Sequence, residues 1–385
     1  MKILQPRRSS ERGAVLIHVA GALLGLLAFT VFVVDYGVMW VSRGQAQTSA
    51  DAGALSGAVA LAYEAEKVNV PKLAAIAVAK ANYIFGQPPV VLREDVLLQN
   101  CPPDAPGLVD MCVRVNVYRN QARGNPLPIF FGTLIGVAGH GVQATATAQL
   151  YAVDKTDCLK PFAIPDKWSE NRLPTGEFNR YDAAGGLLPT PDSYDKPTDV
   201  TAGTGYRIPN DLGLVTLKVG DPNGPIERGL LYPVQVDPTK AGEAEYSSNI
   251  ANCNTRQIAP GTQLIPESDM AEPTKTGIKN LWELDKDANW VLDTSMVAGG
   301  CMAIGTCTRS PRLIAIAAFN PDSYAVTKKD GSPVITVTHV VGFWIDSINA
   351  SGDVVGYFTH YPAMATAAST LIPSASFLRT VILVR

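Results

Sequence analysis

The longest apolar stretch of the chain lies close to its N-terminus. Residues 14–34 carry no formal charge when His18 is neutral. As an α-helix, this stretch of 21 residues would be about 31 Å long, which matches the roughly 30 Å hydrocarbon core of a bilayer. The pattern predicts a helix that spans a membrane.

The helical pattern does not end with the apolar stretch. Small and apolar side chains recur at spacings of three, four and seven residues up to about Glu64, and polar side chains lie elsewhere on the helical wheel. Gly44, Gly53 and Gly57 lie in this second half. A glycine in an exposed helix costs about 1 kcal/mol relative to alanine, so these glycines favour close packing against another backbone. We therefore expect one long helix, half in lipid and half outside it.

Two further glycines lie inside the apolar stretch. Gly21 and Gly25 form a G-x-x-x-G pair, a pattern that is typical of close contacts between membrane helices. The same pattern is frequent by chance in stretches rich in small residues, so a contact face and an incidental pair are both open at this point.

The charges around the apolar stretch predict its orientation. Residues 1–13 form a short basic leader, and the first charge beyond the stretch is Asp35. By the positive-inside rule, the N-terminus stays in the cytoplasm and the bulk of the chain is exported. A cleaved signal peptide is the alternative, but its apolar region usually has about 7 to 15 residues and a small-x-small cleavage site follows it. Residues 35–40, DYGVMW, follow here, so we expect an uncleaved anchor.

Shorter patterns predict the elements that follow. Residues 71–85 have helical spacing, with Pro71 in the first turn and a Gly-Gln-Pro-Pro sequence after the last. Residues 127–135 resemble a short apolar helix. The clearest hairpin joins 340–345 to 354–358. Alternating and β-branched runs predict strands at residues 90–98, 112–118, 141–153, 214–219, 230–236, 312–319, 334–345, 354–361 and 375–384.

Three motifs accompany the long helix. They are Arg12-Gly13-Ala14-Val15 before the apolar stretch, Val34-Asp35-Tyr36-Gly37 after it, and AQTSADAGALSGAVALA over residues 46–62. Together they resemble the N-terminus of the TadG-like proteins of the Tad (Flp) pilus-assembly system. The Gln-x-x-x-Asp-Ala-x-Ala-Leu-x-Gly-Ala pattern carries most of the resemblance, and it contains Asp51, Leu55 and Gly57. We assign these three residues, together with Gly21 and Gly25, to helix packing.

The resemblance extends beyond the helix. GTLIGVAGHGVQATATAQLYA continues it to about residue 153, and residues 158–168 resemble the segment that opens the second part of TadG-like proteins. It implies an α+β fold with a long N-terminal transmembrane helix, a pseudopilin-like small antiparallel sheet and a β-rich second domain. The expected divisions are a basic cytoplasmic leader at 1–13, the membrane helix with its exported continuation at 14–64, a pseudopilin-like α+β unit at 65–153, and a β-rich periplasmic domain with long loops at 154–385.

The same resemblance points to a processing position. Related Tad pseudopilins are cut by a prepilin peptidase after a glycine and carry a glutamate five residues later. Gly13, followed by Ala14, stands at the position of that glycine, but the fifth residue after Gly13 is His18. An uncut anchor is therefore the preferred expectation. His18 itself is interpreted as a neutral imidazole near the membrane interface rather than as a functional ionisable group.

Asp35 stands at the outer edge of the apolar stretch. Two interpretations are open: its carboxylate pairs with a cation or N-terminus of a partner subunit, or it marks the point where the helix enters water. Carboxylates at the membrane interface are inexpensive, which favours the second interpretation.

Six cysteines lie in the part of the chain that is expected outside the cytoplasm, where disulfides persist. An even count fits three bridges, but six cysteines allow fifteen connectivities, and the sequence does not choose among them. A metal site is the alternative, but it lacks a C-x-x-C pair and nearby histidines. Closure between nearest neighbours would pair Cys101 with Cys112 and Cys301 with Cys307, and would leave Cys158 with Cys253.

Composition and motifs narrow the function classes. The net charge is −3, and basic residues cluster only at the N-terminal end, so nucleic acid is not an expected partner. The sequence contains no G-x-S-x-G, no Walker loop and no H-E-x-x-H. Some TadG-like proteins carry a von Willebrand A domain with a metal-binding D-x-S-x-S loop. The nearest match, residues 293–297, ends in Val297 in place of the last serine, so we interpret it as a surface turn without metal.

These observations lead to one functional hypothesis and two alternatives. The first is a non-enzymatic, single-pass protein of the bacterial inner membrane that takes part in Tad/Flp-type pilus assembly or a related secretion apparatus. Its partners would be the inner membrane and other pilus-assembly or pseudopilin subunits, which it would contact through the N-terminal helix and the periplasmic domain, without a cofactor. The alternatives are a membrane-anchored adhesin or ligand-binding module, and an envelope hydrolase whose site lies in residues 154–385.

Overall fold

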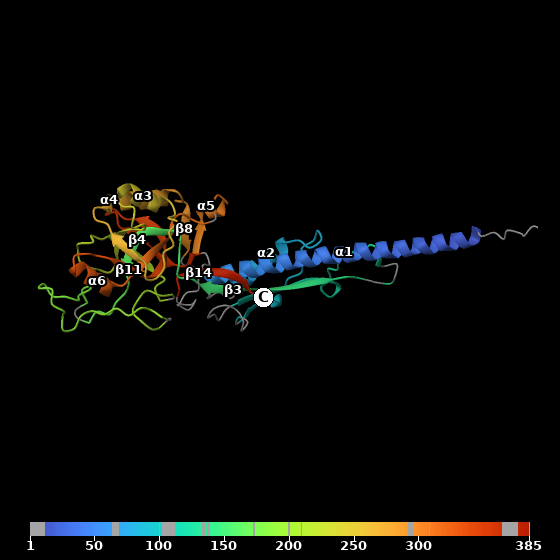
Figure 1. Ribbon diagram of the computed structural model, residues 1–385, viewed down its shortest axis with the longest axis horizontal. Coiled ribbons are helices and arrows are strands. Elements are labelled where there is room, and N and C mark those ends of the chain that lie inside the picture. Colours follow the sequence, from blue (N-terminus) through green and yellow to red (C-terminus); the bar gives the residue numbers. More distant parts are fainter. Residues whose placement is uncertain are drawn as a thin grey trace, which may run out of the picture.

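The chain folds into a β-rich body carried on a long helix. The computed structural model describes residues 12–63, 69–99, 101, 112–132, 136, 139–171, 174–198, 201–208, 210–291, 296–307, 309–363 and 376–384. Figure 1 shows an elongated molecule in which the helix extends away from a small sheet, and a larger β-rich part lies at the opposite end.

Helix α1, Arg12–Tyr63, has 52 residues and is therefore about 78 Å long. Its first half is apolar and exposed, and residues 15–30 all face outward. By length and composition, α1 is a candidate membrane span among the described residues, and the most apolar window has a mean hydropathy of 2.4. This arrangement agrees with the long helix expected from the sequence.

The second half of α1 is covered by its own chain. Helix α2, Asn69–Ala81, packs along it, and small side chains let the two backbones approach closely. Ser49 Oγ donates a buried hydrogen bond of 2.8 Å to the carbonyl oxygen of Ala79 on α2. The buried small residues of α1 are Ser42, Ala46, Ser49, Ala50, Gly53, Ala54, Gly57, Ala58 and Ala62.

A five-stranded sheet lies against this half of α1. Its order is β1-β2-β3-β14-β13, and we call it the helix-side sheet. Valines of β2 and alanines of β3 alternate inward and form one hydrophobic core with α1 and α2. The strands are β1 Val96–Gln99, β2 Cys112–Arg119, β3 Val142–Ala152, β13 Tyr361–Pro362 and β14 Leu378–Val384, and a short 3-10 helix, η1 Arg93–Asp95, precedes β1.

The second β structure closes on itself as a barrel. Each of six strands pairs with two neighbours in the order β10-β4-β6-β5-β12-β11, and β11 returns to β10. Strand β7 adds pairings to both β6 and β11. The strands are β4 Leu159–Pro165, β5 Leu214–Val219, β6 Leu230–Gln235, β7 Gln263–Pro266, β10 Leu313–Phe319, β11 Ile335–Ile348 and β12 Val354–Thr359.

Short helices and one hairpin surround the barrel. The expected β11–β12 hairpin is present, with Phe343 opposite Phe358. The sequence analysis did not predict the helices of this region. These are α3 Glu243–Ala251, α4 Ala271–Glu283, α5 Gly300–Ala303 and α6 Pro321–Lys329, with a separate hairpin of β8 Ala288–Val291 and β9 Met296–Gly299 and a 3-10 turn, η2 Gln121–Arg123, in the helix-side part.

The helix predicted for residues 127–135 is wrong for residues 127–131, although Gly132 has 3-10 helical geometry. Leu127 pairs with His140 in an isolated β-bridge, and the backbone N–H groups of residues 130–132 bond to a side chain of α1 instead of to their own segment. Residues 133–135 lie outside the described residues. An external acceptor for these N–H groups explains why apolar composition alone misled the prediction.

The last strand has an unexpected position. The sequence analysis placed residues 375–384 at the end of the β-rich domain, whereas β14 pairs antiparallel with β3 and completes the helix-side sheet. Arg379 lies opposite Ala152, and Val384 lies opposite Thr147. The chain therefore leaves the helix-side sheet after β3, forms the barrel, and returns. The five-stranded count also differs from the smaller sheet expected for residues 65–153.

Candidate functional site

The packing face of α1 depends on two of its glycines. A Cβ atom built on Gly57 would lie 2.8 Å from Val113 Cγ1 and 3.0 Å from the Ala75 side chain. A Cβ atom on Gly53 would lie 2.9 Å from the Ala79 side chain. These distances are shorter than ordinary van der Waals contact, so α2 and β2 approach α1 as closely as they do because both positions are glycine.

The other motif residues of this region have different environments. Asp51 accepts a hydrogen bond from Gln47 one turn earlier at 2.8 Å on the exposed side of the helix. Gln47 also donates to the carbonyl oxygen of Thr145 in β3. Leu55 is half-buried and packs against the core that α1 shares with α2 and the sheet. Leu55 and Gly57 thus contact the chain's own fold.

The glycines of the apolar stretch contrast with Gly53 and Gly57. Among the described residues, and apart from the backbone of α1 itself, nothing lies within 4 Å of a Cβ atom built on Gly21 or Gly25. Gly21 and Gly57 are separated by about ten helical turns, so the G-x-x-x-G pair continues, on an ideal helix, the side of α1 that is covered further along. Gly13 and Ala14 lie in the first turn of α1, and nothing in the structure tests cleavage between them.

Asp35 has a role that the sequence analysis missed. Its side chain is buried, and the carboxylate accepts hydrogen bonds from the backbone N–H groups of Phe130 at 3.0 Å, Phe131 at 3.2 Å and Gly132 at 2.7 Å. The sequence analysis left two interpretations of Asp35 open: an ion pair with a partner subunit, or the point where the helix enters water. The structure shows neither of these contacts, but hydrogen bonds within the same chain. The carboxylate instead holds a loop that lies 95 to 97 residues away in the sequence. No local signal around Asp35 identifies such a distant partner.

The segment from Gly13 to Ala60 matches a known family. The match is to the model of Flp pilus-assembly TadE/G-like proteins, over residues 13–60. Over these residues the chain is similar to TadE/G-like proteins. The match confirms the resemblance over almost all of α1, whereas its extension to about residue 153 and to residues 158–168 stays a prediction. Comparison with curated proteins and with solved structures gave no significant match. The TadE/G-like match and the apolar helix together fit a membrane-anchored protein.

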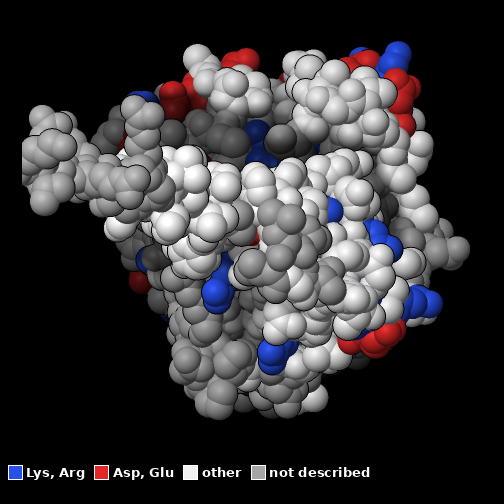
Figure 2. Space-filling view, turned by 90° about the vertical axis from the view of Figure 1, so that its right-hand side faces the viewer, with Lys and Arg blue, Asp and Glu red and all other residues white. Residues whose placement is uncertain are grey.

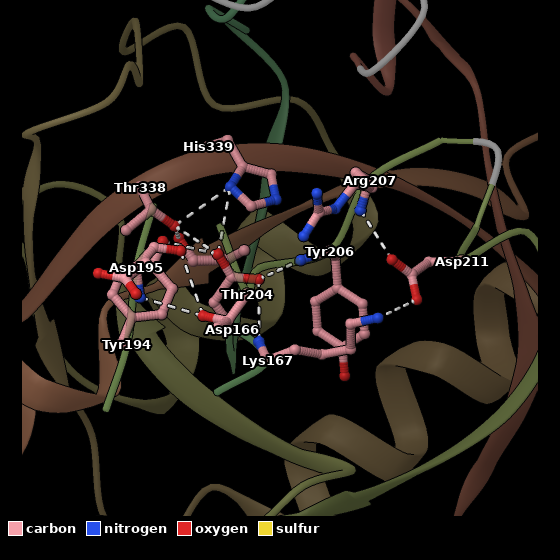
Figure 3. A network of polar contacts seen from close by, with 11 residues as sticks. Asp166, Lys167, Tyr194, Asp195, Thr204, Tyr206, Arg207, Asp211, Thr338 and His339 are labelled. Atoms are coloured by element: carbon pink, nitrogen blue, oxygen red, sulfur yellow. Dashed lines mark hydrogen bonds and ion pairs between the residues drawn. The ribbon is translucent and has the colours of Figure 1, made fainter. Parts of the chain in front are cut away.

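The part beyond the TadE/G-like match contains a buried polar network, shown in Figure 3. Asp166, at the end of β4, is fully buried. Its carboxylate accepts from the backbone N–H of Tyr206 at 2.6 Å, from the backbone N–H of Lys167 at 3.0 Å and from the Tyr194 hydroxyl at 2.8 Å. Burial and the Asp166 charge both raise the pKa of Tyr194, so its hydroxyl stays protonated and donates.

This network fixes a long connection onto the barrel. The described part of residues 166–211 has little regular structure, yet Trp168, Phe178 and Ile208 lie in the barrel core. The rings of Trp168 and Phe178 pack edge to face at 5.5 Å between centroids. Asp166 supplies the acceptors that this irregular backbone needs inside the protein. The surface insertion expected for residues 171–204 is therefore packed onto the barrel at both of its ends.

His339 lies beside Asp166. Its geometry can be compared with that of a catalytic histidine, which the hydrolase alternative would require. Its Nδ1 is 3.5 Å from an Asp166 oxygen and 3.3 Å from the Thr338 hydroxyl, and Nε2 has no hydrogen-bond partner among the described residues. A catalytic histidine presents one ring nitrogen to a carboxylate and the other to a nucleophile. In this protein, the Thr338 hydroxyl and the Asp166 carboxylate both lie near the same ring nitrogen, Nδ1 of His339. Burial lowers the pKa of His339 more than Asp166 raises it, which fits a neutral, structural imidazole.

Three disulfides join all six cysteines. The pairs are Cys101–Cys112, Cys158–Cys253 and Cys301–Cys307, the set that nearest-neighbour closure produces. Beside the second bridge, buried Lys160 donates to the carbonyl oxygens of Ile250 at 2.6 Å and Asn252 at 3.0 Å, where α3 ends. Burial, and then the Arg309 charge, lower the pKa of Lys160 to about 8.

The described residues contain no group of three or more metal-ligating side chains that would hold an ion. The D-x-S-x-S match lies largely outside them, because residues 292–295 are not described. One groove of about 460 Å³ lies beside α4 and the end of β11, and is open to solvent. Charged side chains of both signs line it, including Glu272 and Lys275, which pair at 3.1 Å. This mixed lining does not select one ligand class.

Proposed function

We propose that the protein is a membrane-anchored, non-enzymatic component of Tad/Flp-type pilus assembly or a related secretion apparatus. The TadE/G-like match over α1 carries the proposal, and Tad-like pilus-assembly families are generally non-enzymatic. The helix anchors the chain in the bacterial inner membrane, with the N-terminus in the cytoplasm and the bulk in the periplasm. The disulfides are consistent with that oxidising side of the membrane.

The two pairs of glycines in α1 have different surroundings, and this difference supports the proposal. The chain's own α2 and β2 pack against Gly53 and Gly57, whereas the described residues leave open space beside Gly21 and Gly25. A G-x-x-x-G pair in lipid allows close approach of a second helix. We propose that pilus-assembly or pseudopilin subunits contact the protein at these two glycines, and that residues 65–153, completed by β14, act as a pseudopilin-like unit that supports the helix.

We propose in addition that the anchor remains uncut. His18 stands where the processed relatives are expected to carry glutamate. Intact-mass analysis of the membrane-extracted protein tests this directly. A mass that includes residues 1–13 supports the anchor, and a mass without them shows cleavage after Gly13 and favours a pilus subunit. Loss of the entire apolar stretch would contradict membrane anchoring.

Cross-linking in the native membrane tests the helix contact. All six cysteines are paired, so Gly21→Cys introduces a free thiol into an otherwise fully bridged chain. We expect a photoactivatable cross-linker attached to this thiol to join the chain to a second membrane helix on illumination, and Gly21→Leu with Gly25→Leu to reduce surface pili. Thr30→Leu is the matched control, because Thr30 lies in the same stretch on roughly the opposite side of the helix. Equal loss of pili in both variants would contradict a specific contact at the glycines.

One observation favours a second candidate, an adhesin or ligand-binding module. Three apolar side chains are exposed on the barrel part. Met302 in α5 is 38% exposed, Ile304 just after α5 is 75% exposed, and Leu284 is 67% exposed beside Asp285, whose carboxylate accepts from the backbone N–H of Cys301 in α5. Large exposed apolar patches mark interaction sites. If Leu284→Ser with Ile304→Ser abolishes attachment to surfaces while pili still form, the binding-module function is favoured over assembly.

A further inference from the structure

The loop held by Asp35 lies where the apolar part of α1 ends. Val34 is the last residue of the uncharged stretch and Asp35 is the next. Because the Asp35 carboxylate bonds the backbone of residues 130–132 directly, this part of the loop is fixed at the same level along the helix. In Figure 1, the described part of the connection between β2 and β3 lies beside α1, on the side of the helix-side sheet toward which α1 extends. A membrane around the apolar stretch would therefore begin beside this loop.

Aromatic side chains gather at this level. Tyr36 is 50% exposed, Trp40 is 69% exposed and Phe130 is 53% exposed. The ring of Phe130 packs edge to face against the ring of Phe85, with 6.5 Å between the centroids. Trp40 lies five residues beyond Asp35, which is about 7.5 Å along the helix, and the headgroup layer of a bilayer is about 5 to 7 Å thick. We call Tyr36, Trp40 and Phe130 the aromatic collar.

The charges around the collar match such a position. The sequence carries no Lys, Arg, Asp or Glu between Gly124 and Val153. Figure 2 views the molecule from the side toward which α1 extends. Uncharged residues make up much of the described surface there, most acidic residues lie toward its edge, and basic residues lie nearer its middle. Aromatic residues with little charge around them are typical of surfaces that lie at a membrane–water interface.

At this position, backbone N–H groups of the loop need acceptors other than water, and Asp35 provides them. A loop at the edge of the hydrocarbon has few water molecules to satisfy its N–H groups, and each unsatisfied group is costly. One carboxylate accepts from three consecutive residues, 130 to 132. A side chain of the spanning helix itself thus provides the acceptors, independent of solvent.

We propose that the aromatic collar, with residues 130–132, rests in the headgroup layer on the exported side of the membrane, and that Asp35 is the anchor that holds the loop there. The partner is lipid rather than another protein, because α1 places the collar against the bilayer surface continuously and without a separate binding event. The inference rests on membrane anchoring by α1, which belongs to the proposed function. It adds a second, peripheral contact that would restrict tilting of the exported part.

Fluorescence of single labelled cysteines in vesicles tests the proposal. The full chain would carry an environment-sensitive label at Phe130→Cys, at Leu23→Cys inside the apolar stretch, or at Leu187→Cys on the distant part, and would be reconstituted into phosphatidylethanolamine and phosphatidylglycerol vesicles. We expect iodide to quench the Phe130 label several-fold less than the Leu187 label. Nitroxides near the headgroups should quench the Phe130 label most, and nitroxides deep in the acyl chains should quench the Leu23 label most.

The outcomes separate this inference from the proposed function. If the Leu23 label is protected and the Phe130 label is as accessible as the Leu187 label, the anchor stands and the collar proposal is overturned. If the Leu23 label is accessible to iodide, anchoring itself fails and the inference fails with it. Protection of the Phe130 label that disappears at high lipid-to-protein ratio would identify a second copy of the chain, not lipid, as the partner.

The role of Asp35 has its own control. Asp35→Asn replaces one acceptor oxygen by an amide that faces N–H donors, and it should raise iodide quenching of the Phe130 label several-fold. Asp51→Asn alters an exposed carboxylate of the same helix and should leave that quenching unchanged. An Asp35→Asn variant whose Phe130 label stays protected would overturn the anchoring role of Asp35.

Discussion

Arg379 donates a hydrogen bond from Nη1 to the carbonyl oxygen of Ala62 over 2.8 Å. The bond joins β14 to the last turn of α1, where helix carbonyls lack partners and a cation is favourable. We expect Arg379→Met to lower the free energy of unfolding by about 1 to 3 kcal/mol and Arg379→Lys to lower it less. Urea unfolding of the full chain in micelles measures both changes. Wild-type stability in the methionine variant would contradict a stabilising role for the bond.

The two kinds of glycine in α1 predict opposite effects of one substitution. Gly57→Ala forces a Cβ atom against Val113 and Ala75, and overpacking of this kind costs about 1 to 3 kcal/mol. Gly44→Ala meets nothing within 4 Å and should stabilise the helix by up to about 1 kcal/mol. Thermal unfolding of both variants checks the prediction. Shifts of the same sign would show that helix propensity, not packing, dominates at both positions.

The buried carboxylate of Asp166 predicts a local unfolding effect. Asp166→Asn turns an amide group toward the N–H and O–H donors of Tyr206, Lys167 and Tyr194, and leaves at least one buried donor without an acceptor. Such a defect costs about 1 to 3 kcal/mol. We expect faster proteolysis within residues 171–204. Asp182→Asn, in an exposed turn, is the control, and equal digestion of the two variants would count against the network.

The disulfides differ in the length of chain that they close. Cys158–Cys253 spans 95 residues and Cys301–Cys307 spans 6. Loop-closure entropy predicts losses of about 4.7 and about 2.2 kcal/mol when each pair is replaced by alanine. Urea unfolding of the two double variants measures the difference. The larger loss should follow removal of the long bridge, and the reverse order would show that local packing outweighs chain entropy.

Two buried histidines predict that the protein loses stability in acid. Burial lowers the pKa of His339, against a smaller rise due to Asp166, and burial with the Arg379 charge lowers the pKa of His360 well below its ordinary value. Below about pH 6.5 the unfolded chain binds protons that the folded chain does not. The contribution of each histidine to the free energy of unfolding is therefore complete above that pH. Below it, the free energy of unfolding falls by up to about 1.4 kcal/mol per pH unit for each histidine. His360→Phe should flatten the dependence between about pH 5 and 6.5, and an unchanged slope would contradict this assignment.

The sequence was most informative where one pattern dominates. The ends of α1, the strands β5 and β12 and the β11–β12 hairpin lie close to their predicted positions, because apolar periodicity and turn residues are local signals. The placement of β14 beside β3 depends on pairing between distant segments, which periodicity does not encode. The helices α3, α4 and α6 contain few apolar residues, so the sequence analysis did not recognise them, although the apolar residues of α4 do lie on one side of that helix.

The candidate sites show the same division. Gly57 was identified from its cost in an exposed helix, and the structure shows the backbone that it approaches. Asp35 and Asp166 were not identified as acceptors, because their donors are backbone N–H groups of segments up to 97 residues away. Every residue except proline has a backbone N–H group, so the sequence does not indicate which of them a carboxylate will bind. Only a fold that brings it to the carboxylate reveals the contact.

In the proposed topology, the return of β14 to β3 sets an order of events during export. With the N-terminus in the cytoplasm, the second half of α1 would emerge from the membrane first, and β3 would follow well before residues 153–377 had crossed. Until β14 arrives, one edge of β3 has free backbone groups. The surface of the helix-side sheet is therefore complete only after the barrel segment has been translocated. A partner that recognises this finished surface would, by that fact alone, distinguish fully exported molecules from those still in transit.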